Sequence, residues 1–452
     1  MSEAMPPVIA TGATSSRSRS ARLARASFGT GLGTVASRLT GLARLIVLAY
    51  ALGGLRLADA FNLANNTPNM IHDLVLGGVL AATFVPVFVE RLSTRPEAEA
   101  NESISAVVSL ALVGLVAATV IFVVAAPALI TLFTFGKATP QEHSIAVELL
   151  RMFAPQLLFY GAISLMAAVL ATKDRFGAVG VVPVVNNVIG IIVFALFAAM
   201  ARHASVDYVE HHQSLVYLLG IGTTLGVAAQ ATCLVPSMRR ARTRLRFVWR
   251  PKDPAIRTII SLSGWTFGFV IANQLALFIV LALEFHVGPG AVSAYTYAYT
   301  FFQFPFAVVA TSIINVASPD LARLATRHEW RSVGQRFGVA TKQVLALVLP
   351  AMVGYLLLAR SAVTLLIEHG HEGPHAADLT SSVLVLFALG LPGYCVFFLA
   401  TRTFQAIQDT RTAFVMYVIE NGLNVLVAFL LYKPLGVRGL ALAYSIAYSV
   451  AG

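Results

Sequence analysis

Long apolar stretches separated by short polar loops run through the sequence. Each stretch is long enough for a helix to cross a hydrocarbon core about 30 Å thick. The pattern predicts an all-α membrane protein, a polytopic helical bundle of about 12 spans. The predicted spans are 27–52, 57–91, 103–135, 145–172, 177–202, 215–238, 256–285, 291–322, 334–367, 379–407, 412–432 and 436–452.

Lysine and arginine gather in every second loop. The loops after the second, fourth, sixth, eighth and tenth spans are basic, whereas the opposite loops include acidic or histidine-rich pieces at 207–212 and 368–375. By the positive-inside rule the amino terminus is cytoplasmic. Residues 1–26 are rich in serine, alanine and arginine and lack a signal-peptide pattern, so they predict a disordered, basic cytoplasmic tail.

The chain also repeats itself. Asp174 and Asp409 match at an offset of 235 residues, and Pro68 and Pro305 stand 237 apart, each inside the second span of its half. Because six spans separate equivalent elements, the halves share one orientation, which predicts two pseudo-symmetric lobes with a cleft between them. Chance similarity between apolar segments is the alternative. The predicted units are a tail at 1–26, a six-span N-terminal lobe at 27–238, a basic cytoplasmic linker at 239–255 and a C-terminal lobe at 256–452 with six spans.

Composition narrows the class of protein. The chain is 57% hydrophobic and 12% charged, whereas an ordinary soluble domain is roughly 25% charged. The net charge of +11 sits beside span ends, where topology and anionic lipid account for it, so we expect no nucleic-acid partner. Cys233 and Cys395 lie in apolar runs and support neither a disulfide framework nor a metal site. Motifs for catalysis and nucleotide binding are missing from the sequence, which favours transport or binding over chemistry and predicts no cofactor.

A polar face follows the second span. It consists of Asp59, Asn62, Asn66, Asn69 and Asp73, which recur at the helical spacings of 3, 4, 3 and 4 residues. His72 lies beside Asp73. Pro68 interrupts the backbone hydrogen bonds halfway along this face and predicts a kink, which makes it a hinge candidate. An inert kink is the alternative.

Arg38 and Arg44 lie inside the first apolar span. A charged side chain at membrane depth costs at least about 2.5–3.5 kcal/mol, so such groups normally face a bundle interior or a wet cavity. Guanidinium forks bind phosphate oxygens bidentately, and the pair therefore predicts an anion site. We expect Asp59 to hold an arginine in place when substrate is absent and to compete with the anion for it. The alternative is that one arginine pairs with Asp59 as structure while the other snorkels to the interface.

Several runs of sequence carry a family resemblance. The run SRLTGLARLIVLAYALG is followed by ADAFNLANNTPN and by TFVPVF at residues 83–88, and further landmarks are FQFP at 302–305, ASPDLARL at 317–324 and QDTRT at 408–412. On these residues the chain resembles the MurJ/MviN lipid II flippases of the multidrug/oligosaccharidyl-lipid/polysaccharide exporter superfamily, over essentially everything after residue 26. The run YTYAYTFFQFPFAVVA looks similar to actinobacterial members.

The resemblance implies a V-shaped bundle of fourteen spans, whose cationic central cavity receives the pyrophosphate and sugar-peptide head of an undecaprenyl-linked peptidoglycan precursor. Arg38, Arg44 and Asp59 match functional residues of that family. Where many members have an arginine in the second span this chain has His72, and where they have one in the eighth it has Thr300, so the cavity is less cationic. Because the sequence ends after twelve spans, we expect it to be a fragment of a longer chain.

We therefore expect a multi-pass protein of the bacterial plasma membrane that flips lipid II from the cytoplasmic to the outer leaflet by alternating access. The expected partners are lipid II and membrane lipids. Alternatives are a flippase for another polyprenyl-linked glycan, a cationic-drug exporter, which the leading arginines disfavour, and a transport-inactive scaffold that recruits cell-wall synthesis proteins. The predicted substrate-binding residues are Arg38, Arg44, Asp59, Asn66, Asn69 and His72.

Overall fold

The computed structural model describes residues 33, 35–53, 56–73, 84–173, 177–241, 245–262, 264–369 and 374–452, and regular structure within these ranges is helical. The helices of the first half are Val35–Leu52, α2 (Arg56–His72), α3 (Val85–Thr94), α4 (Glu97–Thr134), α5 (Pro140–Phe153), α6 (Gln156–Ala171), α7 (Gly177–Val181), α8 (Pro183–Met200), α9 (Val206–Glu210) and α10 (Gln213–Arg240). Those of the second half are α11 (Pro254–Leu262), α12 (Gly264–Val287), α13 (Ala291–Pro305), η3 (Phe306–Ala310), α14 (Thr311–Thr326), α15 (Trp330–Leu366), α16 (Pro374–Leu389), α17 (Leu391–Ala406), α18 (Thr410–Leu435) and α19 (Val437–Ala451).

Most of the predicted spans appear as long apolar helices. Within the described ranges, nine helices are long and apolar enough to cross a membrane, and α16 with α17, bent by 50° at their junction, makes a tenth. The two remaining predicted spans correspond to α2 with α3, on either side of the undescribed residues 74–83, and to α19, which has 15 residues. The prediction of an all-α, multi-pass membrane protein is confirmed.

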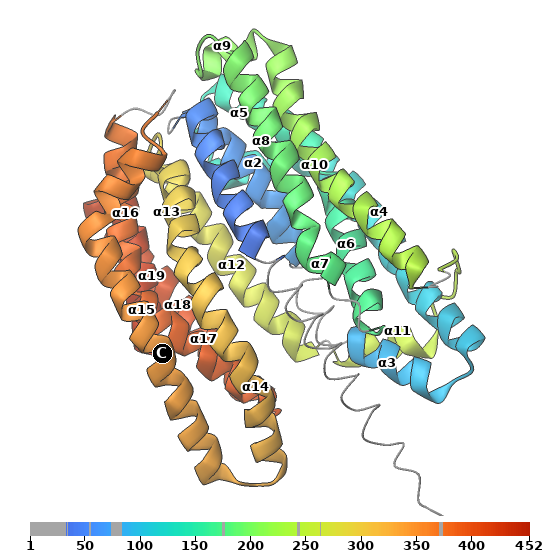
Figure 1. Ribbon diagram of the computed structural model, residues 1–452. Helices are drawn as coiled ribbons and strands as arrows, with labels where there is room; N and C mark the ends of the chain where they lie inside the picture. The colour runs from blue at the N-terminus through green and yellow to red at the C-terminus, as the bar shows by residue number, and fades with distance from the viewer. Residues whose placement is uncertain are drawn as a thin grey trace, which may run out of the picture.

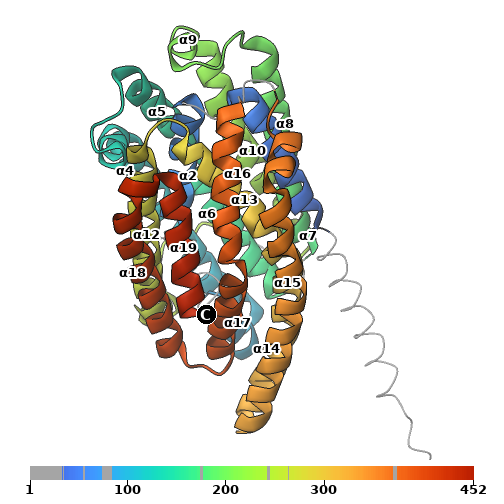
Figure 2. The same ribbon diagram turned by 90° about the vertical axis from the view of Figure 1, so that its left-hand side faces the viewer.

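The helices form two lobes that lean against each other (Figure 1). The first contains Val35–Leu52 and α2 to α10, and the second contains α12 to α19. The lobes diverge towards the lower end of Figure 1, which gives the molecule the predicted V shape. Figure 2 shows α14 and α15 extending together beyond the other helices at this lower end. Helix α11, which the sequence assigns to the second lobe, also packs against α3 and α4 of the first.

Side-chain caps determine where two of the helices begin. Thr139 and Glu142 form a reciprocal capping box at the start of α5. At the start of α18 the carboxylate of Asp409 accepts hydrogen bonds from the backbone N–H and the hydroxyl of Thr412, at 3.0 and 2.6 Å. These bonds lower the pKa of Asp409, because they stabilise its charged form.

Some of the predicted features lie outside the described residues. These are the cytoplasmic tail at 1–26 and the repeat partner of Asp409, namely Asp174.

Small residues permit the closest contacts between helices. A Cβ atom on Gly390 would lie 2.5 Å from the Cα of Ser445, and one on Gly393 would lie 2.6 Å from the Cα of Ser449, both backbone atoms of α19. In lipid, where apolar side chains gain little from leaving the solvent, such close backbone packing is a main source of helix association. It brings the α16–α17 corner directly against α19.

The two repeat-related prolines differ in their surroundings. Pro68 is buried inside α2, which continues to His72. Pro305 ends α13, and the chain passes through the π-helical turn η3 into α14. Since π-helical turns often sit where a helix changes direction, the second lobe carries a visible irregularity at its proline. The hinge role of Pro68 stays a prediction.

We predict that Gly393→Ala lowers the thermal unfolding temperature of the protein in detergent. The added methyl group would meet the backbone of α19, which cannot rotate away, and overpacking typically costs about 1–3 kcal/mol. Gly354→Ala in α15 is the matched control, because a Cβ there meets nothing within 4 Å. Equal unfolding temperatures for the two variants would contradict the close packing of α17 on α19.

Candidate functional site

A cavity of about 420 Å³ lies between the lobes, and we call it the arginine cavity. From the first lobe it is lined by Arg38, which is exposed, and by Arg44, which is half-buried. The opposite wall is α13, through residues that include Tyr299 and Gln303. The structure thus brings both predicted arginines to one cavity and places them across from the second lobe.

Helix α8 positions Val35–Leu52, the arginine-bearing helix that carries Arg38 and Arg44. The side-chain amide of Asn187 donates a hydrogen bond of 3.0 Å to the carbonyl of Ser37. Further along, Gly190 makes room for Arg44, because a Cβ atom there would lie 2.8 Å from the arginine Nε. The guanidinium carbon of Arg44 then lies 5.8 Å from the centre of the Phe194 ring, which is within cation–π range.

The arginine cavity carries positive charge on its first-lobe wall. Among the described residues, no ion pair joins Arg38 or Arg44 to a carboxylate. A positive charge inside a membrane-spanning bundle is costly when it lacks a partner, and an anion entering the cavity would relieve that cost. The planar guanidinium group matches the oxygens of a phosphate or diphosphate.

A second cavity, of about 340 Å³, adjoins the first, and we call it the amide cavity. Asn66, Thr296, Tyr299 and Thr300 line both cavities and therefore form their common border. The predicted site residue Asn69 lines the amide cavity alone. Its other polar lining groups are Asp73, Gln274, Glu284, Tyr295, Asn424 and Tyr444.

Asp59 lies elsewhere, and the predicted pairing with an arginine of the first span is wrong. Its carboxylate accepts hydrogen bonds from the backbone N–H groups of Gly290 and Ser293, at 2.6 and 2.8 Å, and from the Ser293 hydroxyl at 2.7 Å. These donors form the N-terminus of α13, whose own N-cap residue is Gly290 and has no side chain to supply the cap. The first lobe therefore caps a helix of the second.

Further contacts between the lobes lie close to this cap. The side-chain amide of Asn62 donates to the Ser293 hydroxyl at 3.3 Å, and the hydroxyl of Tyr297 donates to the carbonyl of Gly53 at 3.4 Å. All of these bonds join α13 to the helices at the start of the chain. The lobes are consequently held together at one end of α13, on the side where α2 begins (Figure 1).

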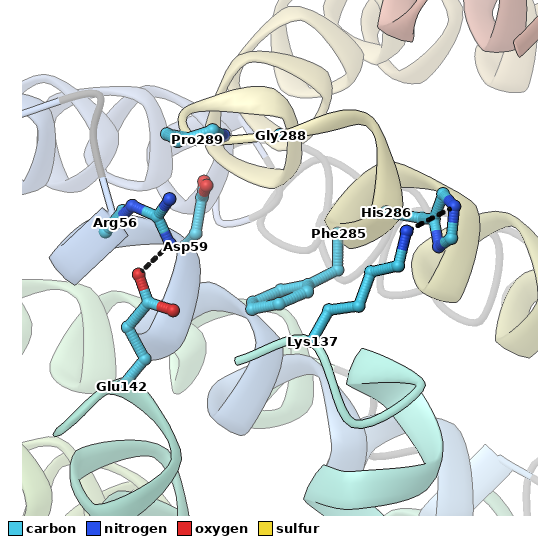
Figure 3. A pocket seen from close by; sticks show the side chains of 8 residues that line it. All are labelled: Arg56, Asp59, Lys137, Glu142, Phe285, His286, Gly288 and Pro289. Atoms are coloured by element: carbon cyan, nitrogen blue, oxygen red, sulfur yellow. Dashed lines mark hydrogen bonds and ion pairs between the residues drawn. The ribbon is translucent and has the colours of Figure 1, made fainter. Parts of the chain in front are cut away.

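A third cavity, of about 170 Å³, is lined by Asp59 at this closed end, and we call it the upper cavity. Figure 3 shows the side chains that line it. Arg56 pairs with Glu142 inside the first lobe. Lys137 donates to Nε2 of His286 at 3.0 Å, which adds a polar contact between the lobes. The upper cavity is therefore lined by charged groups, lies at the end where the lobes touch, and is distinct from the arginine cavity.

Two predicted site residues line neither the arginine cavity nor the amide cavity. His72 packs against α6, where its Nε2 is 3.1 Å from the hydroxyl of Ser164 and its ring is 5.8 Å from that of Tyr160. Asp59 belongs to the upper cavity. A role for His72 in binding stays a prediction.

The group best suited to a metal lies apart from these cavities. Within the described ranges, the carboxylate and imidazole groups of Asp207, Glu210 and His211 lie close enough to share an ion. The backbone carbonyl and the carboxylate of Asp207 raise the pKa of His211, because both stabilise its protonated form. Exposed groups of this kind are common at helix ends, and nothing else here points to a ligand.

The sequence did not single out three residues that shape the site. Gly190 and Asn187 position the arginine-bearing helix, and Ser293 receives Asp59. A weak signal was present for the last of these. The run Gly288 to Gly290 starts a helix without a side-chain cap, so a cap from elsewhere in the fold was needed.

The sequence is similar to known proteins over most of its length. A family model described as "Lipid II flippase MurJ" matches residues 48–451. The "Probable lipid II flippase MurJ" of Rickettsia prowazekii is 26% identical over 417 residues, which cover 92% of this chain and 79% of that protein. The protein of the same name from Haemophilus influenzae is 28% identical over 429 residues, covering 91% and 81%.

Solved structures show the same fold. "Lipid II flippase MurJ, inward closed conformation" matches with a TM-score of 0.79 at 21% identity, covering 93% of this chain and 85% of that one. An inward-facing multidrug resistance MATE family transporter of the MOP superfamily matches with a TM-score of 0.74 at 15% identity, covering 92% of both chains. Because the family model spans most of the sequence, the chain belongs to the lipid II flippase MurJ family.

Proposed function

We propose that this protein flips lipid II from the cytoplasmic to the outer leaflet by alternating access. The observation that carries the proposal is the arginine cavity, where Arg38 and Arg44 lie between two lobes without an acidic partner in the described structure. The substrate is a prenyl diphosphate that bears a disaccharide-peptide, and its diphosphate supplies the missing negative charge. The prenyl tail stays in the bilayer while the head group crosses.

The cost of moving a diphosphate through hydrocarbon explains why a protein cavity is needed. An ion of this size loses a large hydration free energy when it leaves water. Fixed guanidinium groups replace that hydration, and they need no reorganisation when the substrate arrives. Arg44 is held by Gly190 and Phe194, so its fork is already oriented.

The contacts at the upper end supply the closed side of an alternating-access cycle. The proposed cytoplasmic amino terminus places this end outside, so the lobes are closed towards the outer leaflet. Release of the head group outwards requires the bonds from Gly290 and Ser293 to Asp59 to break. Helix α2 carries both Asp59 and Pro68, and bending at Pro68 would let the lobe contact separate while the lower part stays packed.

Arginine chemistry also argues against export of cationic drugs. A cavity for cations would be lined by carboxylates, whereas the arginine cavity presents Arg38 and Arg44.

We predict that Arg44→Ala lowers the rate of lipid II flipping by the reconstituted full-length protein by about tenfold to a hundredfold. The variant loses charge-assisted hydrogen bonds to the diphosphate, worth about 1.5–3 kcal/mol each. Cells that depend on this protein should then fail to grow. Headgroup flipping is measured by accessibility of lipid II to an externally added modifying enzyme.

Two control variants make this measurement specific. Arg44→Lys keeps the charge but loses the planar fork, and it should recover only part of the rate. Arg202→Ala removes an exposed arginine and should leave the rate unchanged. Normal growth and normal flipping by Arg44→Ala would remove this arginine from the mechanism.

We predict that Asp59→Ala loosens the upper end of the molecule. The α13 N-terminus loses its cap from the first lobe, which favours conformations with the lobes apart at this end. Spin labels on cysteines introduced at the exposed residues Phe135 and Leu435, in a background without native cysteines, should shift to longer distances. The measurement is a dipolar distance distribution in detergent or nanodiscs.

Glu142→Gln is the matched control for Asp59→Ala. It removes a carboxylate of the same upper cavity, but one whose partner Arg56 lies in the same lobe. The label distances should therefore stay as in the parent protein. If Asp59→Ala and Glu142→Gln give the same distribution, Asp59 does not hold the lobes together.

A further inference from the structure

A further cavity, of about 470 Å³, shares no lining residue with the arginine, amide and upper cavities, and we call it the linker cavity. One side is lined by the first two turns of α4, including Asn101 and Ser105, and the other by Arg246, Phe247 and Val248 of the predicted linker. We propose that this cavity and the aromatic residues beside it bind the head group of an anionic phospholipid. The proposal goes beyond lipid flipping and does not depend on it.

Serine side chains of α4 hold the linker in place along the cavity. The backbone N–H of Arg246 donates to the Ser105 hydroxyl at 3.3 Å, and the backbone N–H of Val248 donates to the Ser109 hydroxyl at 3.0 Å. These bonds satisfy backbone groups of a segment that has no regular structure of its own. The wall that carries Arg246 is therefore fixed in position on α4.

Two aromatic side chains of the linker are exposed. Phe247 and Trp249 have exposed fractions of 73% and 56%, whereas Val248 between them is half-buried. Because neighbouring side chains of an extended segment point to opposite faces, Phe247 and Trp249 share the face that is turned away from α4. Tryptophan in particular is enriched at the membrane–water interface, where one part of the ring meets apolar groups and the other meets water.

The depth of these rings follows from the pattern of exposure along α4. Its exposed apolar side chains run from Val113 to Leu132, which at 1.5 Å per residue spans roughly 28 Å, close to the hydrocarbon thickness of about 30 Å. Ser109 lies one helical turn before Val113, about 6 Å along the axis. The head-group layer on each side of the hydrocarbon is about 5–8 Å thick. The linker segment that is bonded to Ser109 therefore lies at the level of the phospholipid head groups.

Arg246 gives the linker cavity a positive charge. Among the described residues, no ion pair joins Arg246 to a carboxylate, whereas Glu102, which lines the same cavity, pairs with Arg250 at 2.7 Å. From Arg239 to Lys252 the sequence contains seven basic residues and no acidic one. A guanidinium fork matches the oxygens of a phosphate diester, and the side-chain amide of Asn101 is a neutral donor on the opposite wall.

Depth and charge together favour a phospholipid over an acidic segment of another protein. A protein partner would bind in water beyond the head groups, where exposed rings at head-group level would serve no purpose. In the proposed complex Arg246 contacts the lipid phosphate, while Phe247 and Trp249 lie against the glycerol and the first acyl carbons. With the proposed cytoplasmic amino terminus, α4 begins on the cytoplasmic side, so the lipid belongs to the inner leaflet, which carries anionic lipids.

The test uses the intrinsic fluorescence of Trp249. In the full-length protein every other tryptophan, here Trp265 and Trp330, is replaced by phenylalanine, and the protein is placed in phosphatidylcholine nanodiscs. The discs contain the same fraction of a brominated lipid, either phosphatidylglycerol or phosphatidylcholine, because bromine quenches tryptophan on contact. Quenching should indicate that phosphatidylglycerol is enriched about fivefold at Trp249, which corresponds to about 1 kcal/mol for one arginine at a lipid surface. The enrichment should fall as the salt concentration rises.

Three variants locate the enrichment. Arg246→Gln should make the quenching by the two brominated lipids equal. Arg246→Lys keeps the charge and should retain most of the enrichment. Arg240→Gln is the matched control and should leave the enrichment unchanged, because Arg240 is an exposed arginine of the same basic run that does not line the linker cavity.

Three results would overturn the phospholipid site. The first is equal quenching by the two lipids in the parent protein. The second is an equal loss of enrichment in Arg246→Gln and Arg240→Gln, which would show that the whole basic run attracts anionic lipid. The third is an absence of quenching by either lipid, which would place Trp249 outside the membrane and leave this face to a protein partner. Each result leaves the proposed flipping untouched, because Arg246 and Trp249 do not line the arginine cavity.

Discussion

The free-energy cost of charge at membrane depth is the constraint on which the rest of the structure depends. A guanidinium group cannot face acyl chains without a large penalty, so Arg38 and Arg44 require a polar space inside the bundle. Two lobes diverge from a shared end (Figure 1), and the arginine cavity lies between them. Gly190 serves the same purpose, because its missing Cβ leaves room for the Arg44 side chain against α8.

The contact at the closed end of the V depends on the N-terminus of α13, which has no side-chain cap from its own lobe. Helix α13 begins at Gly290 without a side chain to satisfy its first N–H groups, and Asp59 satisfies them from 231 residues earlier in the chain. A carboxylate at a helix N-terminus gains from both hydrogen bonding and the helix dipole. The same α13 carries Tyr299 and Gln303, which line the arginine cavity, so the capped end and this wall belong to one helix.

Residue patterns were sufficient to predict the helices and to indicate that the two arginines of the first span share a cavity. Apolar periodicity predicted the helices, and the cost of buried charge predicted that Arg38 and Arg44 would share a cavity, because each of these arguments needs only the local sequence. Asn66 and Asn69 reached the cavities for the same reason, as members of one helical face. The partner of Asp59 was misassigned, since an acid near two arginines in sequence does not reveal which donors lie close to it in space. His72 likewise turned towards α6.

The sequence by itself determined the membrane class, the helical spans and the presence of arginines inside the first apolar span, because hydrophobicity and charge act residue by residue. Only the tertiary structure decided which surfaces face each other. It placed α13 opposite the arginines, gave Asp59 to the α13 N-terminus, and gathered Gln274 and Asn424 from α12 and α18 around one cavity. Contacts between residues more than two hundred positions apart depend on how whole helices pack, and no local pattern encodes that choice.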